Sequence, residues 1–234
     1  MKRVAVITPY YNEELELIMK CHESVENQTH PCLHVLVADG NPYAEINKWN
    51  ADHIILPASH NDIGSTPRLI GAYHSIGLDY DIITFLDADN WYGSDHVERI
   101  VSAANNDDPG FITTGRILCR LDGSIMSPCP FTNPKRFIDT NCMAFTRKGY
   151  HLLHNWALMP SYGHLIGDRI MLYHVKRSGI KHTHISESSA YYRCKREGIY
   201  KHFKEQIPAG VLPSPNYKLS YQKWIDDGND PLNA

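Results

Sequence analysis

The sequence predicts an α/β fold, in which a mostly parallel β-sheet carries helices on both faces. In the first half of the 234-residue chain, short apolar runs alternate with amphipathic stretches, the pattern typical of strands separated by helices. Polar clusters directly follow three of the apolar runs, and ligands bind at the carboxyl ends of such strands. No linker separates the two halves, so we expect a single domain with its site at one sheet edge.

The elements of the first half follow from periodicity and from capping residues. A helix is expected over 13–28, where Leu15, Ile18 and Val25 recur at helical spacing. A second helix is expected over 67–78, with Ser65 or Thr66 as its N-cap and a proline at its first position. The remaining predicted elements are strands over 4–7, 33–37, 53–56 and 82–86, and a short helix over 44–49.

The second half has a weaker pattern. The predicted elements are a strand or hairpin over 110–121, a proline-rich loop over 126–134, an apolar segment over 137–146, helices over 147–156 and 168–178, and a short strand over 180–186. From residue 207 onwards, prolines and glycines interrupt every regular pattern, the last of them being Pro231. Residues 207–234 are therefore expected to form an extended tail.

Composition excludes several classes of function. With 21% charged residues, a formal net charge of −3 and no basic block, the chain lacks the clustered cations of a nucleic-acid-binding protein. Its six cysteines contain no Cys-x-x-Cys pair, which favours reduced thiols in a cytosolic protein. No apolar run reaches the ~20 residues that span a bilayer, and the first residues do not read as a signal peptide. We expect a cytoplasmic protein, with peripheral membrane attachment left open.

Two carboxylates, Asp87 and Asp89, end the apolar strand over 82–86. Alternate residues of an extended chain point to the same side, so both can converge on one ligand. A hard cation such as Mg²⁺ takes one or two protein carboxylates and completes its shell with water and substrate phosphates. The pattern thus indicates a metal-diphosphate site. The alternative is a polar turn that caps the next helix.

Five segments of the first hundred residues form a recognisable series. They cover 6–13, 24–29, 35–41, 61–71 with Arg68 and Gly71, and 85–90. Their order and spacing resemble the nucleotide-sugar half of family 2 glycosyltransferases. The resemblance implies a GT-A fold, which is Rossmann-like. It also implies a nucleotide-sugar-binding half over 1–115 and an acceptor-binding half over 116–206.

The resemblance assigns donor-binding roles to residues just beyond the strands. Pro9, Tyr11 and Asn12 would offer an aromatic face and amide contacts to a nucleobase and ribose. Asp39 would accept a hydrogen bond from the base, and Arg68 would bring forked donors toward the nucleotide. The structural alternatives are a strand-to-helix turn, an Asx-turn and a solvated arginine.

The same resemblance identifies a candidate base and a metal. Residues 139–147 are similar to the acceptor-side strand of the family, and Gly167-Asp168-Arg169 is similar to a Glu-Asp pair at the head of a helix. Glycine replaces the first acid, which leaves Asp168 as the base candidate. The helix dipole would lower its pKa, so a useful base needs compensating burial. Asp89 would bind Mn²⁺ or Mg²⁺ directly, and Asp87 would bind ribose or the metal through water.

The implied function is that of an inverting glycosyltransferase, as used in polysaccharide biosynthesis. It would move a sugar from a nucleotide diphosphate sugar to a hydroxyl of a glycan, lipid-linked or other acceptor. The resemblance favours UDP over GDP as the nucleotide of the donor. Two alternatives stay open. A nucleotidyltransferase usually has a glycine-rich basic loop where this chain has Tyr10-Tyr11-Asn12-Glu13, and a non-catalytic nucleotide-sugar-binding module would explain Gly167. The sequence does not identify the sugar, the acceptor, the linkage or the oligomeric state.

Overall fold

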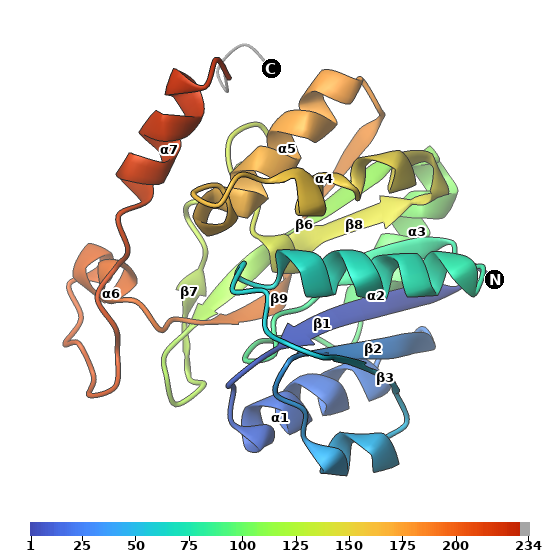
Figure 1. The fold of residues 1–234 in the computed structure, drawn as a ribbon, viewed down its shortest axis with the longest axis horizontal. Coiled ribbons are helices and arrows are strands. Elements are labelled where there is room, and N and C mark those ends of the chain that lie inside the picture. The colour runs from blue at the N-terminus through green and yellow to red at the C-terminus, as the bar shows by residue number, and fades with distance from the viewer. Residues whose placement is uncertain (230–234) are drawn as a thin grey trace.

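The computed structural model describes residues 1–229, in which one continuous sheet is covered by helices on both faces (Figure 1). The strand order is β3-β2-β1-β4-β8-β6-β9-β5, with β7 paired to β6 beside this path. The strands are β1 Val4–Tyr10, β2 Cys32–Asp39, β3 Asp52–Leu56, β4 Ile82–Phe85, β5 Trp91–Tyr92, β6 Phe111–Cys119, β7 Ile125–Pro128, β8 Met143–Thr146 and β9 His182–Arg193. The predicted α/β class is confirmed.

The first half of the sheet is parallel. Val4 of β1 lies opposite Cys32 of β2 and Ile82 of β4, and β3 runs parallel to β2. The direction changes at β8, which pairs antiparallel with both β4 and β6, whereas β6 and β9 are parallel. Because β1, β2 and β4 run the same way, their carboxyl ends meet at one edge of the sheet.

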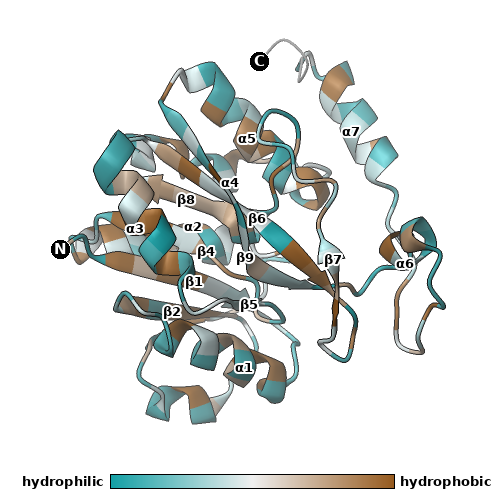
Figure 2. Ribbon diagram, turned by 180° about the vertical axis from the view of Figure 1, so that it is seen from behind, coloured by the Kyte–Doolittle hydropathy of each residue, from teal (hydrophilic) through white to brown (hydrophobic). Residues whose placement is uncertain are grey.

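The helices divide between the two faces. Ile7 of β1 faces α2, whereas the next residue, Thr8, contacts Cys21 of α1 on the opposite face. Helices α2, α4 and α5 lie in front of the sheet in Figure 1, and α3 lies in front in the reverse view of Figure 2. The α-helices are α1 Leu15–Glu26, α2 Ser65–Gly77, α3 His96–Asp107, α4 Asn155–Leu158, α5 Gly167–Ser178, α6 Glu197–Phe203 and α7 Tyr217–Asp226. The 3₁₀ turns are η1 Ala44–Lys48, η2 Thr140–Cys142, η3 Arg147–Leu152 and η4 His164–Ile166.

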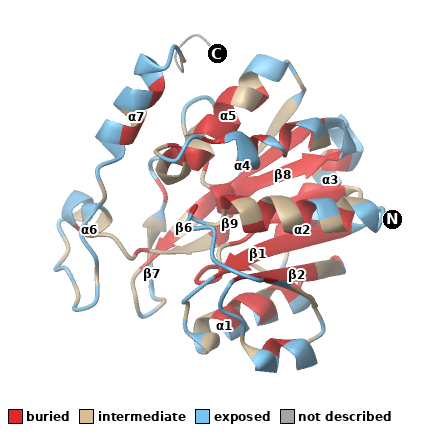
Figure 3. Cartoon of the chain, viewed as in Figure 1, coloured by how far each residue is buried: buried red, intermediate tan, exposed pale blue. Residues whose placement is uncertain are grey.

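The core lies between the central strands and these helices (Figure 3). Every residue of β1 is buried, as expected for a strand covered on both faces, and its first four residues form a continuous apolar run rather than an alternating pattern. Phe85 at the end of β4 packs edge-on against Phe145 of β8 and Trp156 of α4, at ring distances of 6.3 and 5.7 Å. This packing fixes the end of β4, from which the site begins.

Several predicted elements need correction. Gly64 is the N-cap of α2, and Ser65 and Thr66 lie in its first turn. The helix predicted over 147–156 is a 3₁₀ turn followed by the short α4. Helix α3 was not predicted at all.

The extended tail predicted over 207–234 is wrong for Tyr217–Asp226, which form α7. Asn216 caps this helix by accepting a hydrogen bond from the backbone N–H of Leu219, and Trp224 buries its apolar side. Pro231, and the tail prediction over 230–234, lie outside the described residues. Within residues 1–229, no helix has the length and apolar character needed to cross a membrane.

Gly71 provides a test of how closely α2 packs on the sheet. A Cβ atom at this position would lie 2.5 Å from Cγ2 of Ile7 and 3.1 Å from Cγ2 of Val37. We expect Gly71→Ala to lower the free energy of unfolding by about 1–3 kcal/mol, the usual cost of overpacking. Chemical denaturation measures this change.

Gly77, in the last turn of the same helix, is the matched control. A Cβ atom there meets no atom within 4 Å, so Gly77→Ala is expected to be neutral or to stabilise by up to about 1 kcal/mol. Equal effects of the two substitutions would contradict the close packing of α2 on β1 and β2.

Candidate active site

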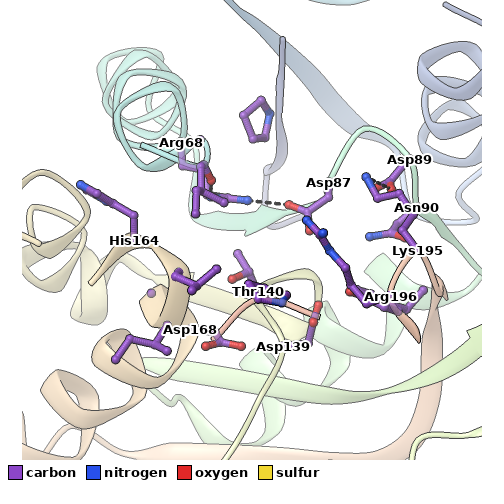
Figure 4. A pocket seen from close by; sticks show the side chains of 18 of the residues that line it. Arg68, Asp87, Asp89, Asn90, Asp139, Thr140, His164, Asp168, Lys195 and Arg196 are labelled. Atoms are coloured by element: carbon purple, nitrogen blue, oxygen red, sulfur yellow. Dashed lines mark hydrogen bonds and ion pairs between the residues drawn. The ribbon is translucent and has the colours of Figure 1, made fainter. Parts of the chain in front are cut away.

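A cavity of about 870 Å³ opens at the carboxyl edge of β1, β2 and β4 (Figure 4). The start of α5 and the segment that follows β9 also contribute residues to its lining. The predicted site residues that line it are Pro9, Tyr11, Asp39, Arg68, Asp87, Asp89 and Asp168. Asn12 does not line the cavity. Its side chain is exposed, and Oδ1 accepts a hydrogen bond from Nδ2 of Asn41 at 2.9 Å.

Asp87 is held in a fixed position by two partners. Nη2 of Arg68 donates to its Oδ1 at 2.6 Å, and Nδ2 of Asn141 donates to its Oδ2 at 3.0 Å. Oδ1 of Asn141 also accepts from the backbone N–H of Asp87 at 2.6 Å. Burial raises the pKa of Asp87, but Arg68 and Asn141 outweigh it, so the pKa lies below its ordinary value. Asp87 is therefore a carboxylate, and its oxygens are oriented before any ligand arrives.

Asn141 connects this carboxylate to a second buried ion pair. Its Nδ2 also donates to Oδ1 of Asp139 at 2.5 Å, and Nη1 of Arg116 pairs with Oδ2 of Asp139. Arg116 is 5% exposed, and its guanidinium carbon lies 4.2 Å from the ring centre of Tyr192. We call the series from Arg68 through Asp87, Asn141 and Asp139 to Arg116 the charge chain. It runs from α2 to β6, and its four charged members line the cavity.

Asp89 has a different partner. Nζ of Lys195 lies 2.6 Å from its Oδ2, and the side chains are 43% and 7% exposed, respectively. Oδ2 of Asp89 is buried, and within residues 1–229 it accepts no well-directed hydrogen bond. Burial raises the pKa of Asp89, and Lys195 opposes that rise without cancelling it. Asp89 is thus a buried carboxylate with one flexible counter-ion.

The Asp-x-Asp segment is not a helix cap. A turn does form, because the N–H of Asn90 donates to the carbonyl of Asp87 at 2.9 Å. However, β5 follows, and α3 begins only at His96, with Asp95 as its N-cap. The alternative of a turn that caps the next helix is therefore wrong.

The donor set suits a hard divalent cation. No cluster of three or more His, Cys, Asp or Glu side chains that would hold a metal alone is found in the described part of the chain. A cation of the Mg²⁺ type needs only one or two carboxylates when phosphate and water complete its shell. The buried Oδ2 of Asp89, which lacks a well-directed donor, has a lone pair to offer, with Asp87 two residues away.

Asp39 anchors a neighbouring loop. Its oxygens accept hydrogen bonds from Oγ of Ser59 at 3.1 Å, from the backbone N–H of His60 at 3.1 Å, and from Nδ1 of His60 at 2.7 Å. Gly40 permits this close approach, because its φ is +83° and a Cβ atom would lie 2.4 Å from the Ser59 nitrogen. Asp39 therefore shapes the wall of the cavity, in addition to the base contact that the resemblance implies.

Asp168 is the second residue of α5 and is partly buried. Its Oδ1 accepts from the backbone N–H of Arg169 at 2.7 Å. Burial and the negative charge of Asp139 raise its pKa to about 6, so burial outweighs the favourable interactions of the helix N-terminus. A carboxylate with this pKa is a suitable general base near neutral pH.

Gly167 is explained by packing. A Cβ atom at this position would lie 3.2 Å from Cζ3 of Trp156 and 3.2 Å from Sδ of Met159. The side chain of an acid has no room there unless Trp156 and Met159 move. The core thus occupies the place where the family usually has its first acid.

Sequence reasoning did not assign roles to Asn141, Asp139, Arg116 and Lys195, which complete the site. Asn141 and Asp139 lie in the segment singled out as acceptor-side, and Lys195 follows β9 by two residues. Their partners are 54, 23 and 106 positions away along the chain, so no local pattern indicates these contacts.

Comparison with known proteins supports the same interpretation. Residues 5–172 match the family described as glycosyl transferase family 2. A search of curated proteins finds no significant match. Among solved structures, S. aureus TarS 1–349 in complex with UDP is similar, with a TM-score of 0.63 and 15% identity over 86% of this chain and 63% of that chain.

Two further structures give the same result. TarS 1–349 in complex with UDP-GlcNAc has a TM-score of 0.62 and 12% identity over 92% of this chain and 62% of that chain. The longer S. aureus TarS has a TM-score of 0.62 and 15% identity over 86% of this chain and 38% of that chain. This chain therefore spans less than two thirds of these proteins, and at such identities they establish the GT-A fold alone. Since the family match covers well over half of the residues, the chain belongs to glycosyl transferase family 2.

Proposed function

We propose that the protein is an inverting glycosyltransferase that moves a sugar from a nucleotide diphosphate sugar to an acceptor hydroxyl. The observation that carries this proposal is the presence of Asp87, Asp89 and Asp168 in one cavity. The acids have complementary properties. Asp87 and Asp89 suit a metal-bound diphosphate leaving group, and Asp168, with its raised pKa, suits the deprotonation of a hydroxyl. The TarS structures with UDP and UDP-GlcNAc favour a UDP-sugar over a GDP-sugar.

The donor side is proposed to lie in residues 1–115. Pro9 and Tyr11 line the cavity beyond β1 and would contact the base and ribose. Arg68 holds Asp87 in place, so that this carboxylate meets the ribose or a metal-bound water in a fixed orientation. A divalent cation, Mn²⁺ or Mg²⁺, held by Asp89 beside Asp87, would act as a Lewis acid on the departing diphosphate.

The acceptor side is proposed to lie in residues 116–206. Above pH 6 the Asp168 side chain is a carboxylate, and its free lone pairs would take the proton of an acceptor hydroxyl. Attack from the face opposite the diphosphate inverts the anomeric carbon. Phe137 and Tyr192 line the cavity and offer aromatic surface to a glycan or lipid-linked acceptor.

Donor binding is tested by calorimetry with UDP and GDP, each with and without Mn²⁺. We expect UDP with Mn²⁺ to bind most tightly, and Asp89→Asn to weaken that binding by about tenfold or more, as loss of a metal ligand commonly does. Asp226→Asn changes an exposed residue of α7 that does not line the cavity, and is the control. Absence of binding for both nucleotides would contradict the proposed function.

The role of Asp168 is tested by Asp168→Asn. The amide cannot accept the proton, so turnover is expected to fall by ~10²–10⁴-fold. The affinity for UDP and Mn²⁺ is expected to stay near that of the wild type, because Asp168 lies across the cavity from the carboxylate pair. Nucleotide release and calorimetry measure the two effects. Near-normal turnover would remove Asp168 from the mechanism.

The pH dependence follows from the pKa of Asp168. Its base form exists above a pKa of about 6, so turnover is expected to rise with pH through that value and to be lost below it. Asp139→Asn removes a negative charge that raises this pKa and leaves Arg116 unpaired, and both changes favour the carboxylate.

The acid limb of the pH-rate profile of Asp139→Asn is therefore expected to move to lower pH. Circular dichroism at each pH checks that the variant is folded. An acid limb that stays in place, or moves to higher pH, would contradict the electrostatic coupling between Asp139 and Asp168.

A further inference from the structure

The contact between Lys195 and Asp89 affects how the divalent cation and the nucleotide bind to the site. We propose that Lys195 is an internal counter-ion that competes with the divalent cation for Asp89 and moves to the donor diphosphate when the cation binds. This inference rests on the proposed function, because it requires a cation and a diphosphate in the same cavity. In this proposal, Lys195 couples the binding of the metal to the binding of the nucleotide.

The two carboxylates of the site differ in how firmly their partners are held. Arg68, the partner of Asp87, has a 9% exposed side chain and also donates from Nη1 to the carbonyl of Ile63 at 2.8 Å. Lys195, the partner of Asp89, has a 43% exposed side chain. Among the described residues, its ammonium has no carboxylate partner other than Asp89. The pair at Asp87 is therefore fixed, and the pair at Asp89 is exchangeable.

The backbone around Asp89 is also fixed. The backbone N–H of Arg193 donates to Oδ1 of Asn90 at 2.8 Å, which ties the turn after β4 to the end of β9. The carbonyl of Lys195 accepts from the backbone N–H of Leu212 at 2.8 Å, so the main chain of Lys195 is anchored too. Only the side chain of Lys195 is free to change partners, and Figure 4 shows it beside Asp89.

Electrostatic interactions of Lys195 link the binding of the cation to the binding of the nucleotide. A buried carboxylate without a counter-ion is strongly destabilising, and Lys195, 2.6 Å from Asp89, is the counter-ion that the structure provides. A divalent cation at Asp89 repels the ammonium, which then leaves the carboxylate. A donor diphosphate in the same cavity offers anionic oxygens to the released ammonium. Metal and nucleotide should therefore bind cooperatively, and the cation alone should bind weakly.

The test is a titration of the 234-residue chain with Mn²⁺, in which free Mn²⁺ is measured by electron paramagnetic resonance. Lys195→Met removes the competing charge, so we expect Mn²⁺ alone to bind at least about fivefold more tightly than in the wild type, within the usual range of coupling between sites. We also expect the gain in Mn²⁺ affinity caused by UDP to shrink by a similar factor.

Two further variants serve as controls. Lys195→Arg keeps the positive charge and is expected to bind Mn²⁺ alone as weakly as the wild type. Lys201→Met removes an exposed lysine that pairs with Glu197 outside the cavity, and no change is expected. If Lys195→Met does not fold, as judged by circular dichroism, Lys195→Gln replaces it.

The outcomes separate this inference from the proposed function. Equal Mn²⁺ affinity in the wild type and in Lys195→Met, with Mn²⁺-dependent binding of UDP intact, would overturn the inference and leave the proposed function standing. Absence of Mn²⁺ binding in every variant, even with UDP, would overturn both the inference and the metal in the proposed mechanism.

Discussion

The site depends on the pairing of acids with buried arginines. Asp87 and Asp139 are both partly buried acids that line the cavity, each is paired with a buried arginine, and Asn141 hydrogen-bonds to both. Removing one member would leave an uncompensated charge, which is far more costly than never having buried the pair. The charge chain therefore holds the proposed donor side and the proposed acceptor side in one fixed relation.

The topology of the sheet brings this chain together. Asp87 follows β4 and Asn141 precedes β8, two neighbouring strands that pair antiparallel. The end of one and the beginning of the other consequently lie at the same edge, although 54 residues separate them in sequence. Because β6 pairs with the other side of β8, Arg116 reaches the same edge. The reversal of strand direction at β8 thus brings residues from both halves of the chain to one edge of the sheet.

Much of the fold was predictable, because the sequence patterns that specify its strands and helices are local. The apolar run of β4, the periodicity of α1 and α5, and Gly179 as the C-cap of α5 are each visible within a dozen residues. Of the two missed helices, α3 does carry a local signal, because Val97, Ile100, Val101 and Ala104 recur at helical spacing. Helix α7 is preceded by prolines that conceal it, and it is stabilised by Trp224, which packs on Tyr173 of α5. Tertiary contacts decide a segment such as α7.

The sequence by itself determined the chemistry that is available: two acids at the end of a buried strand, an aspartate at the head of a helix, and an arginine near the start of another. It also determined the edge of the sheet at which they gather, since parallel strands place their carboxyl ends together. Only the tertiary structure decided which partner each acid has, that burial raises the pKa of Asp168, and that Lys195 faces Asp89. These properties depend on distance and desolvation between residues far apart in the chain, which no local pattern encodes.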